Sequence, residues 1–404
     1  MILHRALRSW SLLVASVALG TPALGQEPTH EVILSENPGA SIAGFASIPG
    51  GGVYVTWSES VPVGGRTRNV LIARRLTSDL ATLSGFAVVD DHRGPETDFQ
   101  CPVVTRLGAD HLAFAWLATT RAGRRIAYRV TTAAGVPVGP VAYADEVTPG
   151  RDAACPQIGG WARGFAIAWP SGSNAEPEIT FHARSFAENG KPVSPRLDMQ
   201  REAPGAGFPP GLAVDSRGHF TVAWTLFSPS GGSPSRLKMR RFLRNGIPTA
   251  RTVEVDRSTS ESAALSTFGR GENEGVEIAW RSVAPSGEGT IRVQRFDRRL
   301  QPLAAPREVA DSNFFGLPSL RIDGRGRSAL AWEPAGTRMN GLYLKPDLSP
   351  CGPAFPVQKD RAVGIATLAF SGPEEVAVGL LEEGADAVRR FVVRTYPLEG
   401  CGAP

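Results

Sequence analysis

Hydrophobic and polar residues alternate in a short stretch that recurs along the chain. The clearest copy is GLAVDSRGHFTVAW at 211–224, in which two apolar runs flank a polar Asp-Ser-Arg-Gly sequence. In the second run, Phe220, Val222 and Trp224 are separated by small residues, as in a β-strand that sends alternate side chains to opposite faces. The stretch predicts a strand, a tight turn and a second strand.

A tryptophan marks the second strand of this stretch in most copies. The marked positions are Trp57, Trp116, Trp169, Trp224, Trp280, Trp332 and, in the last copy, Leu380. The successive separations are 59, 53, 55, 56, 52 and 48 residues, and the residue just before the mark is small each time. A period of this kind indicates a repeat architecture.

The alternating strand has one bulky face and one nearly bare face. Sheets that stack in a ring can pack the bulky face of one unit on the bare face of the next. A strand of a sandwich would instead expose a polar face to water, and the column of alanines is not polar. The pattern therefore favours stacked sheets over a sandwich.

Each unit continues with two further strand-like runs. In the unit at 208–257 these are LKMRRF at 237–242 and TVEV at 252–255, joined by an Asn-Gly-Ile-Pro turn. Four strands in about 54 residues correspond to one propeller blade. The units run near 40–91, 98–147, 153–200, 208–257, 261–311, 317–358 and 363–398. We predict an all-β fold, a single seven-bladed β-propeller of four-stranded antiparallel blades.

The last unit lacks a fourth strand of its own. HEVILS at 30–35 has the pattern of a lone fourth strand, and it could complete the last blade and close the ring. Closure would remove an exposed sheet edge. A disordered N-terminus is the alternative. We expect the propeller to occupy 26–404, with 30–35 as the closing strand.

Residues 1–25 have the features of a signal peptide. Arg5 and Arg8 precede an apolar run at 10–19, and small residues at 23–25 precede Gln26. No later stretch reaches transmembrane length. We expect an exported protein, periplasmic or extracellular, without a membrane anchor.

The positive charge of the chain is carried mainly by arginine. The formal net charge of +4 falls by two when Arg5 and Arg8 are removed. A GC-rich genome or an anionic ligand would each explain the arginine bias, and we favour the genome. Because the arginines are scattered over every unit, we expect no nucleic-acid binding, and we expect a monomer.

The four cysteines stand at equivalent places in pairs. Cys101 and Cys155 each precede a proline at the start of a first strand, and Cys351 and Cys401 each precede a glycine after a third strand. Three pairings are possible, and buried thiols are a further alternative. Equivalence favours Cys101–Cys155 and Cys351–Cys401. First strands meet around the channel, so the first pair has the stronger case.

The sequence offers little catalytic or metal-binding chemistry. The histidines and cysteines lack metal-ligand spacing, and there is no G-x-S-x-G motif. We expect no metal and no cofactor. Aspartates at 215 and 323 begin Asp-x-x-Gly sequences that fit hairpin turns better than calcium loops. Acidic residues predicted near the channel mouth, either solvated or paired for acid–base chemistry, are Asp98, Asp152, Glu261, Asp311 and Asp360.

The phrase DxxGxFxVAW…RxFxxxGxP, clearest from Asp215 to Pro248, resembles the degenerate repeats of secreted bacterial β-propeller proteins. The fifth unit keeps the strands but replaces the glycine with Leu300. The resemblance implies the fold and leaves the function open, because propellers include both enzymes and binding proteins. The S-x-D-x-G-x-x-W box of sialidase-type propellers and the aspartate-rich calcium loop of integrin-type propellers are absent.

The loops between second and third strands are the predicted ligand face. We expect them at 58–69, 117–125, 170–178, 225–236, 281–290 and 333–340, on the same side of the ring as the connections between blades. They are variable and carry arginines, whose planar forks bind carboxylate or phosphate. The candidate residues are Arg66, Arg68, Asp98, Arg124, Arg125, Asp152, Arg236 and Arg281.

Two functions follow from these observations. The first is a non-catalytic exported module that binds a protein or glycan. The second is a carbohydrate-active hydrolase or lyase with carboxylates at the channel mouth. The lack of a recognisable catalytic constellation favours the first.

Overall fold

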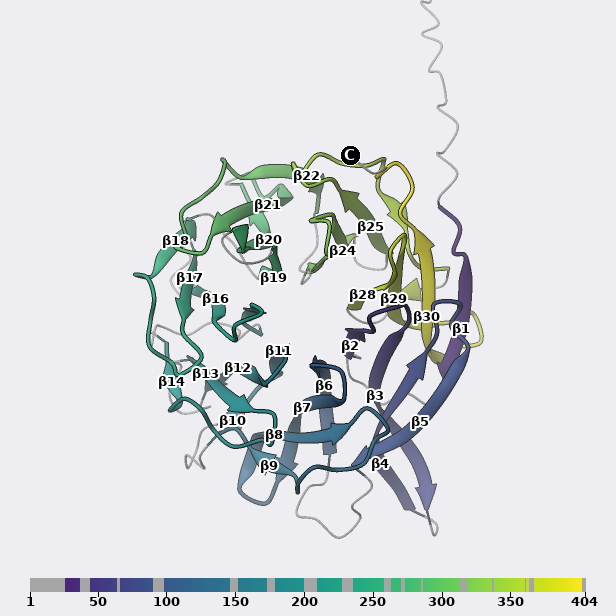
Figure 1. Cartoon of the computed structure of the whole chain (residues 1–404). Coiled ribbons are helices and arrows are strands. Elements are labelled where there is room, and N and C mark those ends of the chain that lie inside the picture. Colours follow the sequence, from purple (N-terminus) through teal and green to yellow (C-terminus); the bar gives the residue numbers. More distant parts are fainter. Residues whose placement is uncertain are drawn as a thin grey trace, which may run out of the picture.

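The computed structural model describes most of the chain from residue 26 onward. The described residues are 26–36, 44–63, 66–89, 98–145, 152–172, 179–199, 209–226, 235–257, 263–269, 273–284, 286–312, 318–335, 338–359, 361–362 and 367–401. Within them the strands form seven antiparallel sheets arranged around a central axis (Figure 1). The chain is a seven-bladed β-propeller. This confirms the fold expected from the repeat, whereas the expected signal peptide at 1–25 lies outside the described residues.

The first four blades contain strands in sequence order from the axis outward. Blade 1 has β2 (Gly44–Ser47), β3 (Val53–Val63), β4 (Arg66–Leu76) and β5 (Thr82–Val89). Blade 2 has β6 (Asp98–Leu107), β7 (His111–Thr120), β8 (Gly123–Thr132) and β9 (Ala142–Tyr143). Blade 3 has β10 (Asp152–Ala153), β11 (Gln157–Trp161), β12 (Gly164–Gly172), β13 (Thr180–Ala187) and β14 (Leu197–Asp198). Blade 4 has β15 (Gly211–Val214), β16 (Phe220–Leu226), β17 (Arg236–Phe242) and β18 (Val253–Asp256).

The remaining blades repeat this order, and the last one borrows a strand. Blade 5 has β19 (Ala263–Phe268), β20 (Gly275–Val283), β21 (Gly289–Asp297) and β22 (Arg307–Asp311). Blade 6 has β23 (Ser319–Ile322), β24 (Ser328–Ala335), β25 (Arg338–Leu344) and β26 (Phe355–Pro356). Blade 7 has β27 (Arg361–Ala362), β28 (Thr367–Gly372), β29 (Glu375–Glu383), β30 (Arg389–Pro397) and the N-terminal β1 (His30–Ser35).

The N-terminal strand closes the ring, as predicted. β1 pairs with β30 in antiparallel register, with Glu31 opposite Arg394. The Arg394 guanidinium donates to Glu31 and also to Glu382, at 2.8 Å from Nη2 to Oε2. Leu34 is buried beside Val53 and Val55 of blade 1. Closure therefore combines a backbone ladder, a buried charge network and apolar packing.

Neighbouring blades pack a bulky face on a small one. Ala113 and Ala115 of blade 2 lie in one buried cluster with Phe165, Ile167 and Trp169 of blade 3. Blade 7 follows the same rule with Leu380 in place of tryptophan, packed against the alanines at 329 and 331 of blade 6. The alternation of large and small residues along each second strand thus supplies the core between blades.

Arginines of the third strands also tie blades together. Arg129 of blade 2 donates from Nη1 to the Val88 carbonyl of blade 1 at 2.8 Å. Arg394 of blade 7 makes the same kind of bond to Val357 of blade 6, at 3.2 Å. Arg295 of blade 5 reaches forward to blade 6, where its Nη2 donates to a backbone carbonyl at 326. Part of the arginine content therefore has a structural use that composition alone did not reveal.

Two disulfides join neighbouring blades. Cys101 pairs with Cys155 between blades 2 and 3 at the channel wall, with 5.4 Å between their Cα atoms. Cys351 pairs with Cys401 between blades 6 and 7, with 4.8 Å between their Cα atoms. These are the two pairings that the equivalent positions favour. Disulfides persist in oxidising compartments.

Several predicted loops are instead extensions of the strands. The loop expected at 58–69 is largely a hairpin, because β3 runs to Val63 and β4 starts at Arg66. The loop expected at 117–125 is likewise a hairpin between β7 and β8. An antiparallel ladder is held by hydrogen bonds between backbone groups and does not require apolar side chains. It can therefore continue through polar residues beyond the blade core. The described part of the chain contains no helix that is long and apolar enough to cross a membrane.

Candidate functional site

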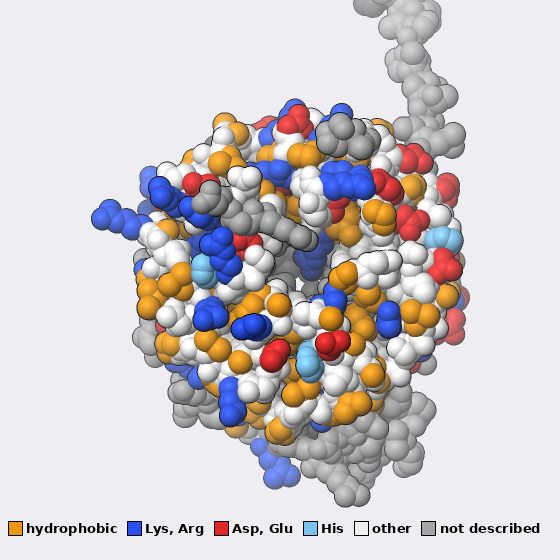
Figure 2. Space-filling view, viewed as in Figure 1, with side chains coloured by type: hydrophobic (Ala, Val, Ile, Leu, Met, Phe, Trp, Pro, Cys, Tyr) orange, Lys and Arg blue, Asp and Glu red, His pale blue; other side chains and the backbone are white. Residues whose placement is uncertain are grey.

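The central channel is a cavity of about 490 Å³ between the innermost strands. All seven blades contribute to its wall, mainly through β2, β6, β11, β15, β19, β23 and β28. In the space-filling view the channel opens in the middle of the ring, and basic side chains lie around it without forming one patch (Figure 2). A rigid ring thus encloses a space of the size that small ligands occupy.

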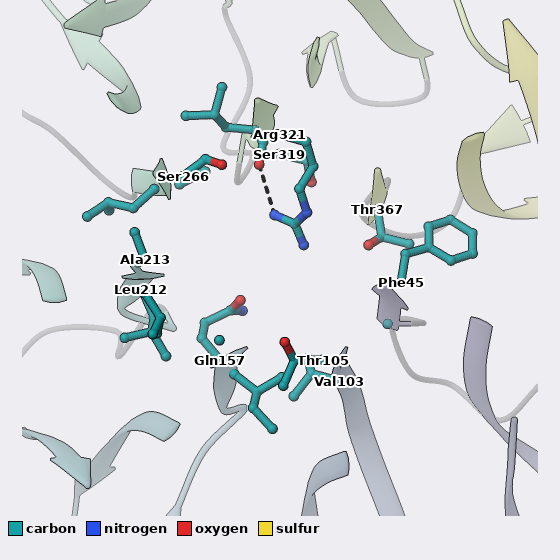
Figure 3. Close-up of a pocket in the computed structure, with 18 of the residues that line it drawn as sticks. Phe45, Val103, Thr105, Gln157, Leu212, Ala213, Ser266, Ser319, Arg321 and Thr367 are labelled. Atoms are coloured by element: carbon teal, nitrogen blue, oxygen red, sulfur yellow. Dashed lines mark hydrogen bonds between the residues drawn. The ribbon is translucent and has the colours of Figure 1, made fainter. Parts of the chain in front are cut away.

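Arg321 projects from β23 into this channel (Figure 3). Its Nη1 donates to the backbone carbonyl of the adjacent Leu320 at 2.8 Å, a bond within its own strand. Burial lowers the pKa of the Arg321 guanidinium, because loss of water disfavours the charged form. The Gln157 amide and the Thr105 and Thr367 side chains face the same space from other blades. These groups can donate and accept hydrogen bonds around a ligand.

Arg321 also breaks the sevenfold repeat. It lies opposite Ala329, three residues before the marker Trp332. In the other blades the residue in this register is small: Ala46, Thr105, Gly159, Ala213, Ser266 and Ala369. A large cation therefore stands where the remaining blades have a small residue, several of them packed against the next blade. Alignment of the seven units could have revealed this residue, which the sequence reasoning did not single out.

The expected ligand-face residues fall into three groups. The described exposed ones are Arg124, Asp152 and Arg236. The Arg124 backbone N–H donates to Asp152 Oδ1 at 3.0 Å, so the β7–β8 hairpin and the connection to blade 3 lie on the same side of the ring, as expected. The side chains of Arg66, Arg68 and Asp98 lie outside the described residues.

The third group makes structural contacts within the ring. Arg125 donates to the Asp145 carbonyl at 2.7 Å, and its guanidinium carbon lies 3.9 Å from the centroid of the Tyr143 ring. Arg281 is buried, and its Nε donates to the Ser312 carbonyl at 2.9 Å. These two arginines are committed to holding loops in place. Their use as ligand contacts would require breaking those bonds.

The acidic residues expected at the channel mouth are not brought together in the described structure. Asp152 and Asp311 are exposed, whereas Glu261, Asp360 and the Asp98 side chain lie outside the described residues. The described wall of the channel contains two charged residues, Arg106 and Arg321, and no carboxylate. No group of three or more histidine, cysteine or acidic side chains in the described residues could hold a metal ion.

Blade 3 contains a Ser–His–Asp hydrogen-bond chain that sequence reasoning missed. Ser171 Oγ lies 2.7 Å from His182 Nε2, and His182 Nδ1 lies 2.8 Å from Asp198 Oδ1. Partial burial would raise the pKa of Asp198, but hydrogen bonds and charge from His182 and Arg196 lower it, so this carboxylate is ionised at neutral pH. The cross-strand register brings these residues together, and that register is hidden in the sequence by the loops between them.

Comparison with known proteins supports the fold alone. No family model matches the chain, and no curated protein matches it in sequence. A crystal structure of a protein of unknown function from Dyadobacter fermentans is similar, with a TM-score of 0.53, 13% identity and coverage of 93% of this chain and 99% of that one. An α-L-arabinanase from Penicillium chrysogenum has a TM-score of 0.52 and 11% identity, with coverage of 92% of this chain and 99% of its own.

Proposed function

We propose that this protein is an exported binding module that holds its ligand in the central channel, with protein or glycan as the ligand class. The observation that carries the proposal is the channel itself, an open space of about 490 Å³ with hydrogen-bonding side chains from several blades. The described wall lacks the carboxylate pair that general acid–base chemistry needs. Recognition therefore fits the channel better than turnover does.

The two inter-blade disulfides support action in the periplasm or outside the cell, because such bonds persist where the environment is oxidising. We propose that the protein acts as a monomer without a membrane anchor and does not bind nucleic acid.

A screen of the mature protein on glycan arrays and in pull-downs tests the binding function. Each hit would be repeated on Ser266→Trp, which places a large ring at the wall of the channel where blade 5 has a small residue. We expect the variant to keep its melting midpoint and lose the hit. Ligands that bind both proteins equally would place recognition elsewhere and contradict the proposal.

A carbohydrate-active hydrolase or lyase is the alternative, with acidic residues at the channel mouth as its catalytic groups. Asp152 and Asp311 are the described candidates, and Asp152 is tested first because it lies beside Arg124. Turnover assays on polysaccharides would be run with the mature protein and with Asp152→Asn. Turnover that this substitution abolishes would establish the enzyme and overturn the binding proposal.

The Ser171–His182–Asp198 chain favours a second candidate function, hydrolysis of an acyl ester. The ionised Asp198 holds the proton on His182 Nδ1, which leaves Nε2 to accept the Ser171 proton as Oγ attacks. A fluorophosphonate probe would test this function by labelling Ser171 in the wild type and not in His182→Gln. Ser282 stands at the equivalent place in blade 5, where Arg292 replaces the histidine opposite the marker tryptophan, and it serves as the internal control. Absence of label on Ser171 would leave the chain as a structural tie.

A further inference from the structure

We propose that Arg321 anchors the carboxylate of a small, hydroxyl-rich ligand, such as a sugar acid, in the central channel. The inference rests on the proposed binding function and names the chemical class of the ligand. No sequence motif points to it. It follows from the charge, the geometry and the polar surroundings of one side chain.

The charge of the channel favours an anion. The charged residues of the described wall are Arg106 and Arg321, so both charges have the same sign. The Arg321 guanidinium bonds to a neutral carbonyl, and burial lowers its pKa without an offsetting carboxylate. An anionic ligand would supply the missing countercharge.

The geometry of Arg321 favours a carboxylate. The bond from Nη1 to the Leu320 carbonyl fixes one side of the guanidinium against β23. The Nε and Nη2 edge remains for a ligand, and two parallel N–H groups on that edge match the two oxygens of a carboxylate. Figure 3 shows the guanidinium directed into the open channel and away from the wall.

The surroundings of Arg321 favour a ligand with hydroxyl groups. Gln157, Thr105 and Thr367 face the guanidinium across the channel, from blades 3, 2 and 7. An amide and two hydroxyls can each both donate and accept, as sugar hydroxyls require. A volume of about 490 Å³ accommodates one or two sugar rings.

The departure from the repeat supports a dedicated role for this residue. The six equivalent positions are small, and a small residue there would satisfy the packing of a first strand in blade 6 as well. Arginine at this place gains one local hydrogen bond while its charge loses water. A ligand that binds the guanidinium offsets this cost.

Binding of defined probes to the mature protein tests the proposal. D-glucuronate and D-galacturonate would be compared with glucose, galactose, acetate and inorganic phosphate by ligand-observed NMR and thermal shift. We expect a sugar acid to bind and to compete with any channel ligand found in the screen. Arg321→Ala should weaken it about 10- to 100-fold, the range for a lost hydrogen-bonded charge. Arg321→Lys should retain part of the affinity. Arg251→Ala, an exposed arginine outside the channel wall, is the matched control and should leave binding unchanged.

Four outcomes would overturn the proposal in distinguishable ways. Absence of binding by either sugar acid, or equal binding of glucose, would refute the carboxylate. Phosphate or acetate that binds as tightly as the sugar acids would refute the hydroxyl-rich class. If Ser266→Trp abolished binding of a ligand and Arg321→Ala left its affinity unchanged, the role of Arg321 would be refuted and the binding function would stand. If the wild-type protein bound no ligand in the channel, both the binding function and the role of Arg321 would be refuted.

Discussion

At the scale of the residue, the marker position of each second strand, tryptophan in six blades, contributes to the contact between blades. Blade 7 uses Leu380 where the other blades use tryptophan, and this leucine is 1% exposed. Leu380 lies in one buried cluster with Tyr343, Phe355 and Tyr396. The contact between blades 6 and 7 therefore forms without the tryptophan.

Leu380→Ala should lower the free energy of unfolding by about 2–5 kcal/mol, since it leaves a cavity in a packed core. Leu303 is 58% exposed, and Leu303→Ala should change the same quantity very little. Chemical denaturation of the two variants measures the difference. Equal effects would show that the contact between blades 6 and 7 does not depend on this side chain.

Two arginines on β21 make ion pairs that differ in their contribution to stability. Arg295 binds Glu277 at 2.8 Å, where the carboxylate is fully buried, and burial raises the pKa of Glu277 although Arg295 and Ser328 act to lower it. Arg292 binds Glu308 at 2.6 Å on the surface. Removal of Arg295 leaves a buried carboxylate without its partner.

Arg295→Met should cost about 3–5 kcal/mol of stability, and Arg292→Met less than about 1 kcal/mol. The double variant Glu277→Gln/Arg295→Met should recover much of the loss, because it removes the stranded charge. Urea unfolding of the four proteins gives the comparison. If Arg295→Met behaved like Arg292→Met, the network would not contribute to the ring.

Residue identity alone predicts backbone geometry poorly at the turns between third and fourth strands. Gly246 adopts a positive φ of 87° in blade 4, and Leu300 adopts 60° at the equivalent place in blade 5. Both turns keep the same backbone bonds, from Gly246 to Leu243 and from Leu300 to Asp297. Burial of the leucine offsets the steric cost of that conformation, so the turn survives without its glycine.

At the scale of the element, the closing strand is held by ion pairs as well as by its backbone ladder. Glu31 on β1 lies between Arg394 and Lys359, which lower its pKa from 4.5 although partial burial acts to raise it. A depressed acid pKa contributes stability above the unfolded value, and that contribution disappears as the pH falls through the folded value. The seal of the ring therefore weakens in acid.

Glu31→Gln should lower stability by about 1 kcal/mol at neutral pH, after allowance for partial exposure. The difference from wild type should stay constant above pH 4.5, the ordinary pKa of the group, and shrink below it. Glu27→Gln, at an exposed position before the strand, is the control. Melting midpoints across the pH range provide the test, and a difference that grows in acid would contradict the assigned role of Glu31.

Strand existence was predictable from periodicity, while strand length was not. The alternation around each tryptophan identified the second strands, and the leftover run at 30–35 identified β1. The extension of β3 to Val63 was hidden because Ser58, Glu59 and Ser60 interrupt the apolar alternation and Pro62 is unusual in a strand. The Ser171–His182 contact was hidden for a related reason, since it depends on the register across β12 and β13.

At the scale of the whole molecule, the disulfides act on the unfolded chain. The two bonds close loops with sequence separations of 54 and 50 residues. Chain-entropy arguments give about 4 kcal/mol for each loop of that size. Peptide mapping under non-reducing conditions should recover both pairs, and a crossed pair would contradict the structure.

Cys101→Ser/Cys155→Ser and Cys351→Ser/Cys401→Ser should each lose stability by about 4 kcal/mol or somewhat less. Reductant should lower the denaturation midpoint of each variant further, because it breaks the one disulfide that the variant retains. A double-Ser variant as stable as wild type under oxidising conditions would mean that the unfolded chain is already restricted at that place.

The pairing of β1 with β30 imposes an order on folding, because the two strands lie at opposite ends of the propeller sequence. The contact between Glu31 and Arg394 spans 363 residues, so the first strand to leave the ribosome or cross a membrane is the last to find its partner. Until the final blade arrives, β1 is an unpaired edge that any similar strand could capture. A truncated product would therefore keep a free closing strand at one end and an open blade at the other, and two such products would have complementary ends to exchange.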